Sequence, residues 1–563
     1  MPDIKSLLPR QVADAYVDDL IALDPVTGTY LGVKESSSRL PDYSPAGQEA
    51  LAELARTTLA RLDEAERQPG ADSDVERRCG RLLRERLTAG LAMHEADEHL
   101  RAVGNMHTPG HSVRDIFTVT PTATDEDWAA VAERLRAVPA ALAGYRESLA
   151  LGLQRGLYAA PRPTATFVEQ LTEWSDMDGS GRGWYEDFAA AGPDALRAEL
   201  DEAARAATGA VAELRDWMRE TYAPAVEGAP DTAGHERYAR WARYFNGTDL
   251  DLDEAYAYGW SEFHRLLGEM RQEAERVLPG AATPWAALAH LDEHGRHVEG
   301  VDEVRAWLQG LMDRAVEDLD GTHFELAERV RRVEAHIAPP GGAAAPYYTA
   351  PSEDFSRPGR TWLPTMGLTR FPVYDLVSTW YHEGVPGHHL QLAQWAHVAQ
   401  DLSRYQATVG VVSANAEGWA LYAERLMDEL GYLADPEERL GYLDAQMMRA
   451  IRVIIDIGMH LELEIPADSP FHPGERWTPE LAQEFFGTHS SRPADFVESE
   501  LTRYLTMPGQ AIGYKLGERA WLRGRDLARE RHGAGFDLKS WHMAALSQGS
   551  LGLDDLVDEL SRL

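Results

Sequence analysis

Apolar residues recur at every third or fourth position along most of the chain, the spacing of helices with one buried face. Alternating runs of Val, Ile and Thr, which would predict strands, are scarce in its 563 residues. The sequence therefore predicts an all-α protein, a large helical fold with few short strands. The clearest predicted helices, rich in Ala, Leu, Glu and Arg, cover residues 45–66, 127–153, 193–221, 253–277, 302–335, 417–431 and 440–464.

The sharpest interruption of this helical pattern lies at residues 338–361, a stretch too rich in Pro and Gly to form a helix. Nearly all of the recognisable chemistry follows it. We therefore expect a helical N-terminal part, residues 1–337, and a helical catalytic, metal-binding part, residues 338–563. The two halves are expected to flank a substrate cleft.

The charge and composition exclude several classes of partner. The chain has 92 acidic and 55 basic residues, a formal net charge of -37, which repels nucleic-acid phosphates and anionic membrane surfaces. Its single cysteine, Cys79, excludes an intrachain disulfide and a cysteine metal cluster. The first residues do not have the pattern of a secretion signal, and no run of about 18 apolar residues occurs. We expect a cytoplasmic protein that binds neither nucleic acid nor membrane.

A candidate metal motif lies in residues 371–395, where His382 and Glu383 stand side by side on a predicted helix. Helical zinc hydrolases usually carry a second histidine four residues after the first, with the adjacent glutamate as base. Here the next histidines, His388 and His389, come six and seven residues later. Six residues turn a regular helix by about 240°, and seven advance it by about 10 Å, so neither histidine would reach the same ion.

The residues between the histidines predict an interruption of this helix. Pro386 cannot donate to the carbonyl of His382 and costs about 3 kcal/mol in a helix interior. Gly384 and Gly387 weaken the helix further and allow unusual dihedral angles. We therefore predict a bulge or break between Gly384 and Gly387 that returns a histidine to the metal-facing side. The spacing alone leaves His388 and His389 both open as the second ligand.

A later helix, predicted in residues 413–426, offers the third ligand. Glu417 lies among Ala, Gly and Trp, where a carboxylate is costly unless it is paired or bound to metal. Gly418 and Ala420 are small enough for another helix to approach closely. Glu424, seven residues after Glu417 on the same face, is an alternative ligand or an acceptor that orients a ligand histidine. We favour Glu417 as the ligand.

Three segments resemble a bacterial family catalogued as domain of unknown function 885. They are YHEGVPGHHLQ at 381–391, AEGWALYAE at 416–424 and ESELTRYLTMPGQAIGYKLG at 498–517, and the resemblance extends over nearly the whole chain. That family is similar in turn to helical gluzincin zinc metallopeptidases, the peptidyl dipeptidases and carboxypeptidases, which carry a Gly-His pair after His-Glu. Alignment of this pair implies a zinc ion bound by His382, His388 and Glu417.

Further residues are candidates for completing the active site. Arg449, Arg452, Asp456 and His460 form a polar stripe on predicted helix 440–464, which faces either a cleft or a salt-bridge network. His460 is a candidate for contacting a substrate carbonyl. The helical dipeptidases have an Arg-Tyr pair whose tyrosine stabilises the tetrahedral intermediate, and the resemblance implies this role for Tyr504. The candidates for binding the substrate are Arg357, Arg449, Tyr514 and Lys515.

The predicted function is zinc-dependent hydrolysis of amide bonds in short peptides. Glu383 would act as general base towards a water activated by the metal and then protonate the leaving amine. The preference for short peptides is implied by the family resemblance. One alternative is a di-iron carboxylate oxidoreductase, which needs paired Glu-x-x-His motifs that we do not find correctly placed. The other is a non-enzymatic helical protein that binds a metal or a peptide.

Overall fold

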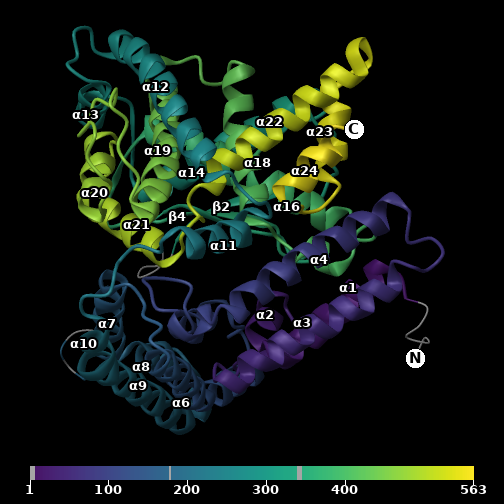
Figure 1. Ribbon diagram of the computed structural model, residues 1–563, viewed down its shortest axis with the longest axis vertical. Coiled ribbons are helices and arrows are strands. Elements are labelled where there is room, and N and C mark those ends of the chain that lie inside the picture. The colour runs from purple at the N-terminus through teal and green to yellow at the C-terminus, as the bar shows by residue number, and fades with distance from the viewer. Residues whose placement is uncertain (1–6, 177–178, 180, 339–344) are drawn as a thin grey trace. The chain divides into compact units, whose positions relative to one another are not determined.

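The computed structural model describes residues 7–176, 179, 181–338 and 345–563 (Figure 1). It is 67% helical and 4% strand, which confirms the predicted all-α class with few short strands. Among the described residues, no helix is both long enough and apolar enough to cross a membrane.

The chain forms two compact units. Unit 1 consists of Met1–Ala233 and Ser499–Met507, and unit 2 of Gly234–Glu498 and Pro508–Leu563. The predicted division after residue 337 differs from this one, because residues 234–337 contribute helices and two strands, β1 (His297–Glu299) and β2 (Val333–Ile337), to unit 2. The Pro/Gly-rich stretch that suggested the division lies inside unit 2, and its residues 339–344 lie outside the described residues.

Unit 1 is a helical assembly whose core lies between α6 and α9, with α7 and α8 packed on α9. A second layer is formed by α1, α3 and α4, which pack on one another (Figure 1). Its elements are α1 (Pro9–Leu23), α2 (Pro25–Tyr30), η2 (Lys34–Ser36), α3 (Pro45–Ala65), α4 (Asp74–Glu95), η3 (Glu98–Arg101), α5 (Pro109–Val119), α6 (Asp125–Gln154), α7 (Pro161–Ser175), α8 (Trp184–Ala189), η4 (Asp194–Leu196), α9 (Arg197–Trp217), η5 (Met218–Tyr222) and α10 (Ala223–Val226).

Unit 2 combines helices with two small sheets. Its elements are α11 (His235–Asn246), α12 (Leu252–Val277), α13 (Pro284–His294), β1 (His297–Glu299), α14 (Val301–Leu319), β2 (Val333–Ile337), β3 (Tyr347–Thr349), β4 (Gly359–Leu363), β5 (Arg370–Pro372), α15 (Val373–Glu383), α16 (His388–His397), α17 (Arg404–Ala407), α18 (Ser413–Glu429), α19 (Pro436–Leu461), α20 (Pro479–Thr488), α21 (Ala494–Thr506), α22 (Gly513–His532), η6 (Gly533–Gly535), α23 (Leu538–Leu546) and α24 (Leu553–Leu560). The last residues of α21 belong to the segment grouped with unit 1.

The strands are short and flank the motif helix. β1 pairs antiparallel with β5, which leads directly into α15. In the other sheet, of order β2-β4-β3, β4 pairs parallel with β2 and antiparallel with β3, so that Thr361 lies between Ala335 and Tyr348.

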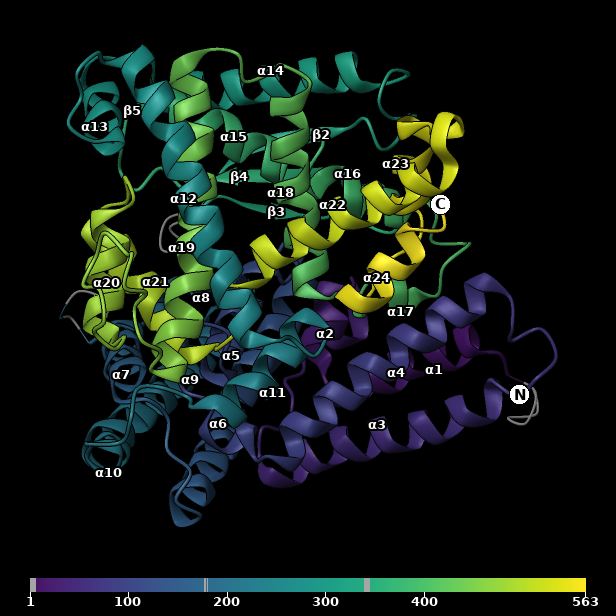
Figure 2. The same ribbon diagram turned by 45° about the horizontal axis from the view of Figure 1, so that its top comes forward.

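Helix α19 lies at the centre of unit 2. Every residue from Leu440 to His460 is buried, as expected of a helix enclosed on all sides. α12 runs along it in both views, and α15 packs on it as well (Figures 1 and 2). The Asp435 side chain caps its start by accepting from the backbone N–H of Glu437. The charged residues between Leu440 and His460 are therefore buried.

Helix α18 crosses α22 at close range. A Cβ atom at Gly418 would overlap the backbone of Gly517, so the two glycines let the backbones touch. The close helix approach predicted from the small residues beside Glu417 is thus confirmed.

Candidate metal centre

The motif helix is broken between its two histidine positions. α15 ends at Glu383 and α16 begins at His388, while Gly384 and Gly387 have non-helical ψ angles of -118° and -129°. The Val385–Pro386 peptide bond is cis. The interruption predicted between Gly384 and Gly387 is confirmed.

The turn between the two helices is held by hydrogen bonds from both sides. The N–H of Gly387 donates to the carbonyl of Tyr381 at 3.0 Å. The indole Nε1 of Trp419, on α18, donates to the carbonyls of Pro386 and Gly387 at 3.0 and 3.1 Å. A Cβ atom at Gly387 would overlap the carbonyl oxygen of His382, so this position requires glycine. The turn and the ligand-bearing helix α18 are thereby tied together.

Three candidate ligands converge on one point: His382, His388 and Glu417. One ligand atom from each lies within 4.8 Å of the other two. Glu417 Oε2 is 3.4 Å from Nε2 of His382 and 3.4 Å from Nε2 of His388. The two imidazole rings are nearly perpendicular, with centroids 4.8 Å apart. Among the described residues, these are the only three His, Cys, Asp or Glu side chains that could hold a metal ion together.

This donor set fits a zinc ion. Ligand atoms about 2.0–2.2 Å from a tetrahedral zinc are about 3.4 Å from one another, which matches the separations at Glu417 Oε2. That oxygen is buried and forms no hydrogen bond within the described part of the chain, an arrangement that is costly unless a cation satisfies it. Two neutral imidazoles and one carboxylate are common zinc ligands at sites that keep a position open for water.

The orientation of His382 is set by Glu424. Nδ1 of His382 donates to Glu424 Oε1 at 2.7 Å, which leaves Nε2 as the atom facing Glu417. The other carboxylate oxygen, Oε2, accepts from Ser378 Oγ at 2.6 Å and from Gln446 Nε2 at 3.3 Å. Glu424 therefore stands in the orienting position that the sequence left open. The Nδ1 atom of His388 has no such partner among the described residues.

The electrostatics of the site favour a cation. Burial lowers the pKa of His382, but the carboxylates of Glu417 and Glu424 outweigh it and raise that pKa to about 9. Burial likewise acts to raise the pKa of Glu417, and the two imidazoles bring it well below its usual range. The carboxylate thus remains charged at neutral pH, ready to bind a metal.

Glu383 is buried beside the candidate ligands. Burial raises its pKa, while the nearby charges of His382, His388 and Arg449 act in the opposite direction. No hydrogen bond holds its carboxylate within the described residues. Its position next to the ligands suits a group that takes and returns protons.

His389 does not face this centre. Its Nε2 donates to the carbonyl of Val330 at 2.7 Å, and its Nδ1 accepts from the Tyr348 hydroxyl at 2.9 Å. Both ring nitrogens are occupied, so the alternative that His389 is the second ligand is not supported.

Two of the predicted substrate-binding residues lie close to the ligands. The ring of Tyr514 is nearly parallel to that of His382, with centroids 6.4 Å apart. The guanidinium of Arg452 lies 4.7 Å from the centroid of the Tyr514 ring. Nη2 of Arg449 is 4.0 Å from Glu424 Oε1. The polar stripe predicted on α19 therefore reaches the metal centre at Arg449.

The prediction that Lys515 binds the substrate needs correction. Its fully buried Nζ donates to Gln446 Oε1 and Glu518 Oε2, both at 2.6 Å, and lies 3.4 Å from Glu262 Oε2. An ammonium group has three donors, and these partners engage them all. Through Gln446 the lysine supports Glu424 instead of binding a substrate.

His460 is a second correction. Its Nε2 lies 3.7 Å from Asp456 Oδ1, and its ring packs against Tyr238 with centroids 5.4 Å apart. It follows Arg449 by eleven residues, about 16 Å along a helix. The structure therefore does not bring His460 to the three ligands, and the predicted contact with a substrate carbonyl is not supported.

Tyr504 has a local partner, and Arg357 lies in a loop. Tyr504 belongs to the segment grouped with unit 1, where its hydroxyl donates to Glu500 Oε2 at 2.8 Å. Arg357 lies in the loop between β3 and β4, and burial lowers its pKa. The catalytic role of Tyr504 and the substrate-binding role of Arg357 stay predictions.

Sequence reasoning missed three residues that shape the site: Ser378, Trp419 and Gln446. Ser378 and Gln446 donate to Glu424, and Trp419 holds the turn. Ser378 precedes His382 by four residues, so helical spacing alone places it on the same face. The contact of Gln446 depends on how α19 packs and has no local signal.

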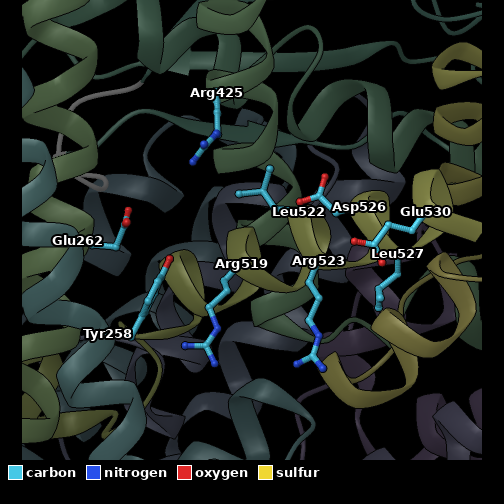
Figure 3. A pocket seen from close by; sticks show the side chains of 9 residues that line it. All are labelled: Tyr258, Glu262, Arg425, Arg519, Leu522, Arg523, Asp526, Leu527 and Glu530. Carbon is cyan, nitrogen blue, oxygen red and sulfur yellow. The ribbon is translucent and has the colours of Figure 1, made fainter. Parts of the chain in front are cut away.

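A cavity of about 430 Å³ opens elsewhere in unit 2, among α12, α18 and α22 (Figure 3). Several of its charged side chains have partners, such as Arg519 with Glu254 and Arg425 with Glu429. Six of its lining side chains are charged, and within the described residues it contains no group of candidate metal ligands, so it is a weaker candidate than the metal centre. Its lining residues are Tyr258, Glu262, Arg425, Arg519, Leu522, Arg523, Asp526, Leu527 and Glu530.

A family of bacterial proteins matches most of the chain. The model of a family described as "Bacterial protein of unknown function (DUF885)" matches residues 25–560. Among curated proteins, none matches the chain.

Two solved structures share the fold. The chain is similar to a "putative lipoprotein" from Colwellia psychrerythraea, with 21% identity, a TM-score of 0.84 and 98% of each chain covered. It is also similar to a "putative lipoprotein of unknown function" from Shewanella oneidensis, with 18% identity and a TM-score of 0.74, over 99% of this chain and 100% of that one. The cytoplasmic location expected for this chain stays a prediction.

Proposed function

The chain belongs to the DUF885 family of bacterial proteins of unknown function, and we propose that it is a zinc-dependent hydrolase that cleaves amide bonds in short peptides. The observation that carries the proposal is the convergence of two imidazole nitrogens on a buried carboxylate oxygen that has no hydrogen bond among the described residues. His388 and Glu417 keep 12% and 21% of their side chains exposed, which is consistent with a site that water and substrate can enter.

His382, His388 and Glu417 would hold the zinc ion. When bound, such an ion polarises a substrate carbonyl and lowers the pKa of water towards about 7. Glu383 accepts the proton that the attacking water loses and delivers it to the nitrogen of the leaving amine. Glu424 keeps His382 in the tautomer whose Nε2 faces the metal position.

The choice of a peptide amide over other substrates rests on the resemblance to gluzincin metallopeptidases. That resemblance aligns the His-Glu pair, the Gly-His pair after it and the glutamate on a later helix with the corresponding positions of those enzymes, with two residues inserted here between the two pairs. Tyr504 is the proposed donor to the developing oxyanion, again by that resemblance.

The di-iron alternative needs more carboxylate and imidazole ligands than this site offers. Within the described residues only one group of three candidate ligands occurs, and Glu424 is already bonded to three donors. A mononuclear centre is therefore the better-supported proposal.

Metal analysis of the purified protein, together with an assay on a mixed peptide library, tests the function. We expect about one zinc per chain, cleavage of short peptides, loss of cleavage after chelation and its return when one equivalent of zinc is added. Stoichiometric zinc without cleavage of any peptide would favour the non-enzymatic alternative, and two irons per chain would favour the oxidoreductase.

A further inference from the structure

Arg449 carries unused hydrogen-bonding capacity next to the metal centre. Only 8% of this residue is exposed, although a buried guanidinium normally has its five N–H donors satisfied. Nη1 donates to the carbonyl of Ala445 at 3.0 Å, and Nε has no hydrogen-bond partner within the described residues. Its nearest carboxylate, at 4.0 Å, is Glu424, which is beyond hydrogen-bond range.

Both carboxylate oxygens of Glu424 accept hydrogen bonds from other residues. His382, Ser378 and Gln446 all donate to its two oxygens. The carboxylate that lies closest to Arg449 is therefore used to orient a metal ligand. Arg449 is thus buried beside the centre, and its Nε can donate to another acceptor.

The position of Arg449 links it to the reacting groups. The same oxygen of Glu424, Oε1, lies 4.0 Å from Nη2 of Arg449 and 2.7 Å from Nδ1 of His382. Its charge also acts on Glu383, the proposed base. A second buried guanidinium, that of Arg452, follows one turn later on α19 and lies against Tyr514, which stacks beside His382. Two guanidinium groups thus lie near the site in a chain whose net charge is -37.

We propose that Arg449 binds a carboxylate of the substrate next to the scissile amide, so that the preferred substrates carry a free carboxylate close to the cleaved bond. A guanidinium fork matches a carboxylate in a two-point contact, and the buried setting strengthens it. The carboxylate can be the C-terminus of a peptide or an acidic side chain. This inference rests on the proposed hydrolytic function for its meaning, but the binding that it predicts can be measured without turnover.

The test uses zinc-loaded full-length protein carrying Glu383→Gln, so that bound peptides persist. Calorimetry compares a tripeptide with a C-terminal carboxylate against the same tripeptide as its C-terminal amide. In a second pair, both peptides are C-terminal amides, and one carries Glu and the other Gln next to the scissile amide bond. We expect at least one carboxylate peptide to bind about tenfold or more tightly than its neutral partner, the scale of a hydrogen bond to a charged group. The pair that shows the preference identifies which carboxylate is recognised.

Adding Arg449→Met should abolish this preference by weakening the carboxylate peptide alone, and Arg449→Lys should restore part of it. Arg439→Met is the matched control, because Arg439 lies on the same helix, about 15 Å away by helical rise, in ion pairs with Asp428 and Glu273. That control should keep the preference. Zinc content and circular dichroism establish that each variant binds zinc and is folded. If Arg449→Met does not fold, the comparison is made with Arg449→Lys alone.

Two results would overturn the inference: equal binding of charged and neutral peptides in both pairs, or an undiminished preference after both Arg449 substitutions. Its failure is distinct from that of the proposed function. Cleavage without any carboxylate preference would refute only the role of Arg449. Carboxylate-selective binding that depends on Arg449, in a protein that cleaves nothing, would refute only the hydrolase.

Discussion

At the scale of single residues, the proposed metal centre depends on the carboxylate of Glu417 between two imidazoles. That Glu417 is a candidate metal ligand could be predicted from the local sequence, because a glutamate among Ala, Gly and Trp on a helix requires a partner. The choice between His388 and His389 could not. It depends on Tyr348 and Val330, which lie 41 and 59 residues away in the chain and occupy both nitrogens of His389.

Removal of a ligand should remove the metal. We expect His382→Ala or Glu417→Ala to reduce bound zinc from about one per chain to nearly none after dialysis, because two protein ligands bind zinc far more weakly than three. Metal content measured by inductively coupled plasma mass spectrometry checks this. Glu429→Ala, which removes a carboxylate from the same helix but one paired with arginines, should keep its zinc. Unchanged zinc in both ligand variants would mean that the ligand set is misassigned.

Glu424 should matter through His382 and not as a ligand. Glu424→Gln keeps the size of the side chain but removes the charge that fixes the imidazole. We expect zinc to remain bound with an affinity lower by about 10–100-fold, as is usual for partners of metal-bound histidines. Competition with a chelating dye measures this affinity. Complete loss of zinc would instead identify Glu424 as a ligand, and an unchanged affinity would remove its orienting role.

At the scale of elements, the break between α15 and α16 decides which histidine lies beside His382 and Glu417. It could be predicted because proline and glycine act on the backbone locally. The partners that hold the turn could not, since Trp419 reaches it only through the packing of α18. The partners of Lys515 could not be predicted either, because they also depend on helix packing. The lysine donates to Gln446 and Glu518.

Gly387 is the most sensitive position of this turn. Gly387→Ala would push a Cβ atom into the carbonyl of His382 and shift a ligand-bearing helix end. We expect a loss of stability of about 2 kcal/mol or more together with weaker zinc binding, measured by chemical unfolding and metal titration. Gly268→Ala is the matched control: it lies within α12 with no atom within 4 Å of the added Cβ, and should be neutral or stabilising by up to about 1 kcal/mol. Equal behaviour of the two variants would contradict the account of the turn.

At the scale of the whole molecule, all three candidate ligands belong to unit 2. The predicted boundary followed the Pro/Gly-rich stretch, a local signal. The observed division follows long-range packing, in which α12 lies along α19 and β2 pairs with β4. Such contacts between distant segments have no signature in a single sequence.

Zinc should therefore stabilise unit 2. At a free zinc concentration a hundredfold above its Kd, binding contributes about 2.7 kcal/mol. Calorimetric scans of chelated and zinc-loaded protein should show the unfolding of unit 2 shifted upwards by several degrees. The Glu417→Ala variant should show no shift. A zinc-induced shift of the same size in that variant would place the metal elsewhere in the chain.

The most direct test of the central claim compares wild-type protein with Glu383→Gln at equal zinc content, on a peptide that the wild type cleaves. Glu383 is adjacent to the ligands without being one, so the variant should keep its zinc, its fold and its affinity for the peptide. Because the proton acceptor is lost, kcat should fall by about 100-fold or more, with KM little changed. Cleavage at the wild-type rate by the zinc-loaded variant would contradict the proposed mechanism.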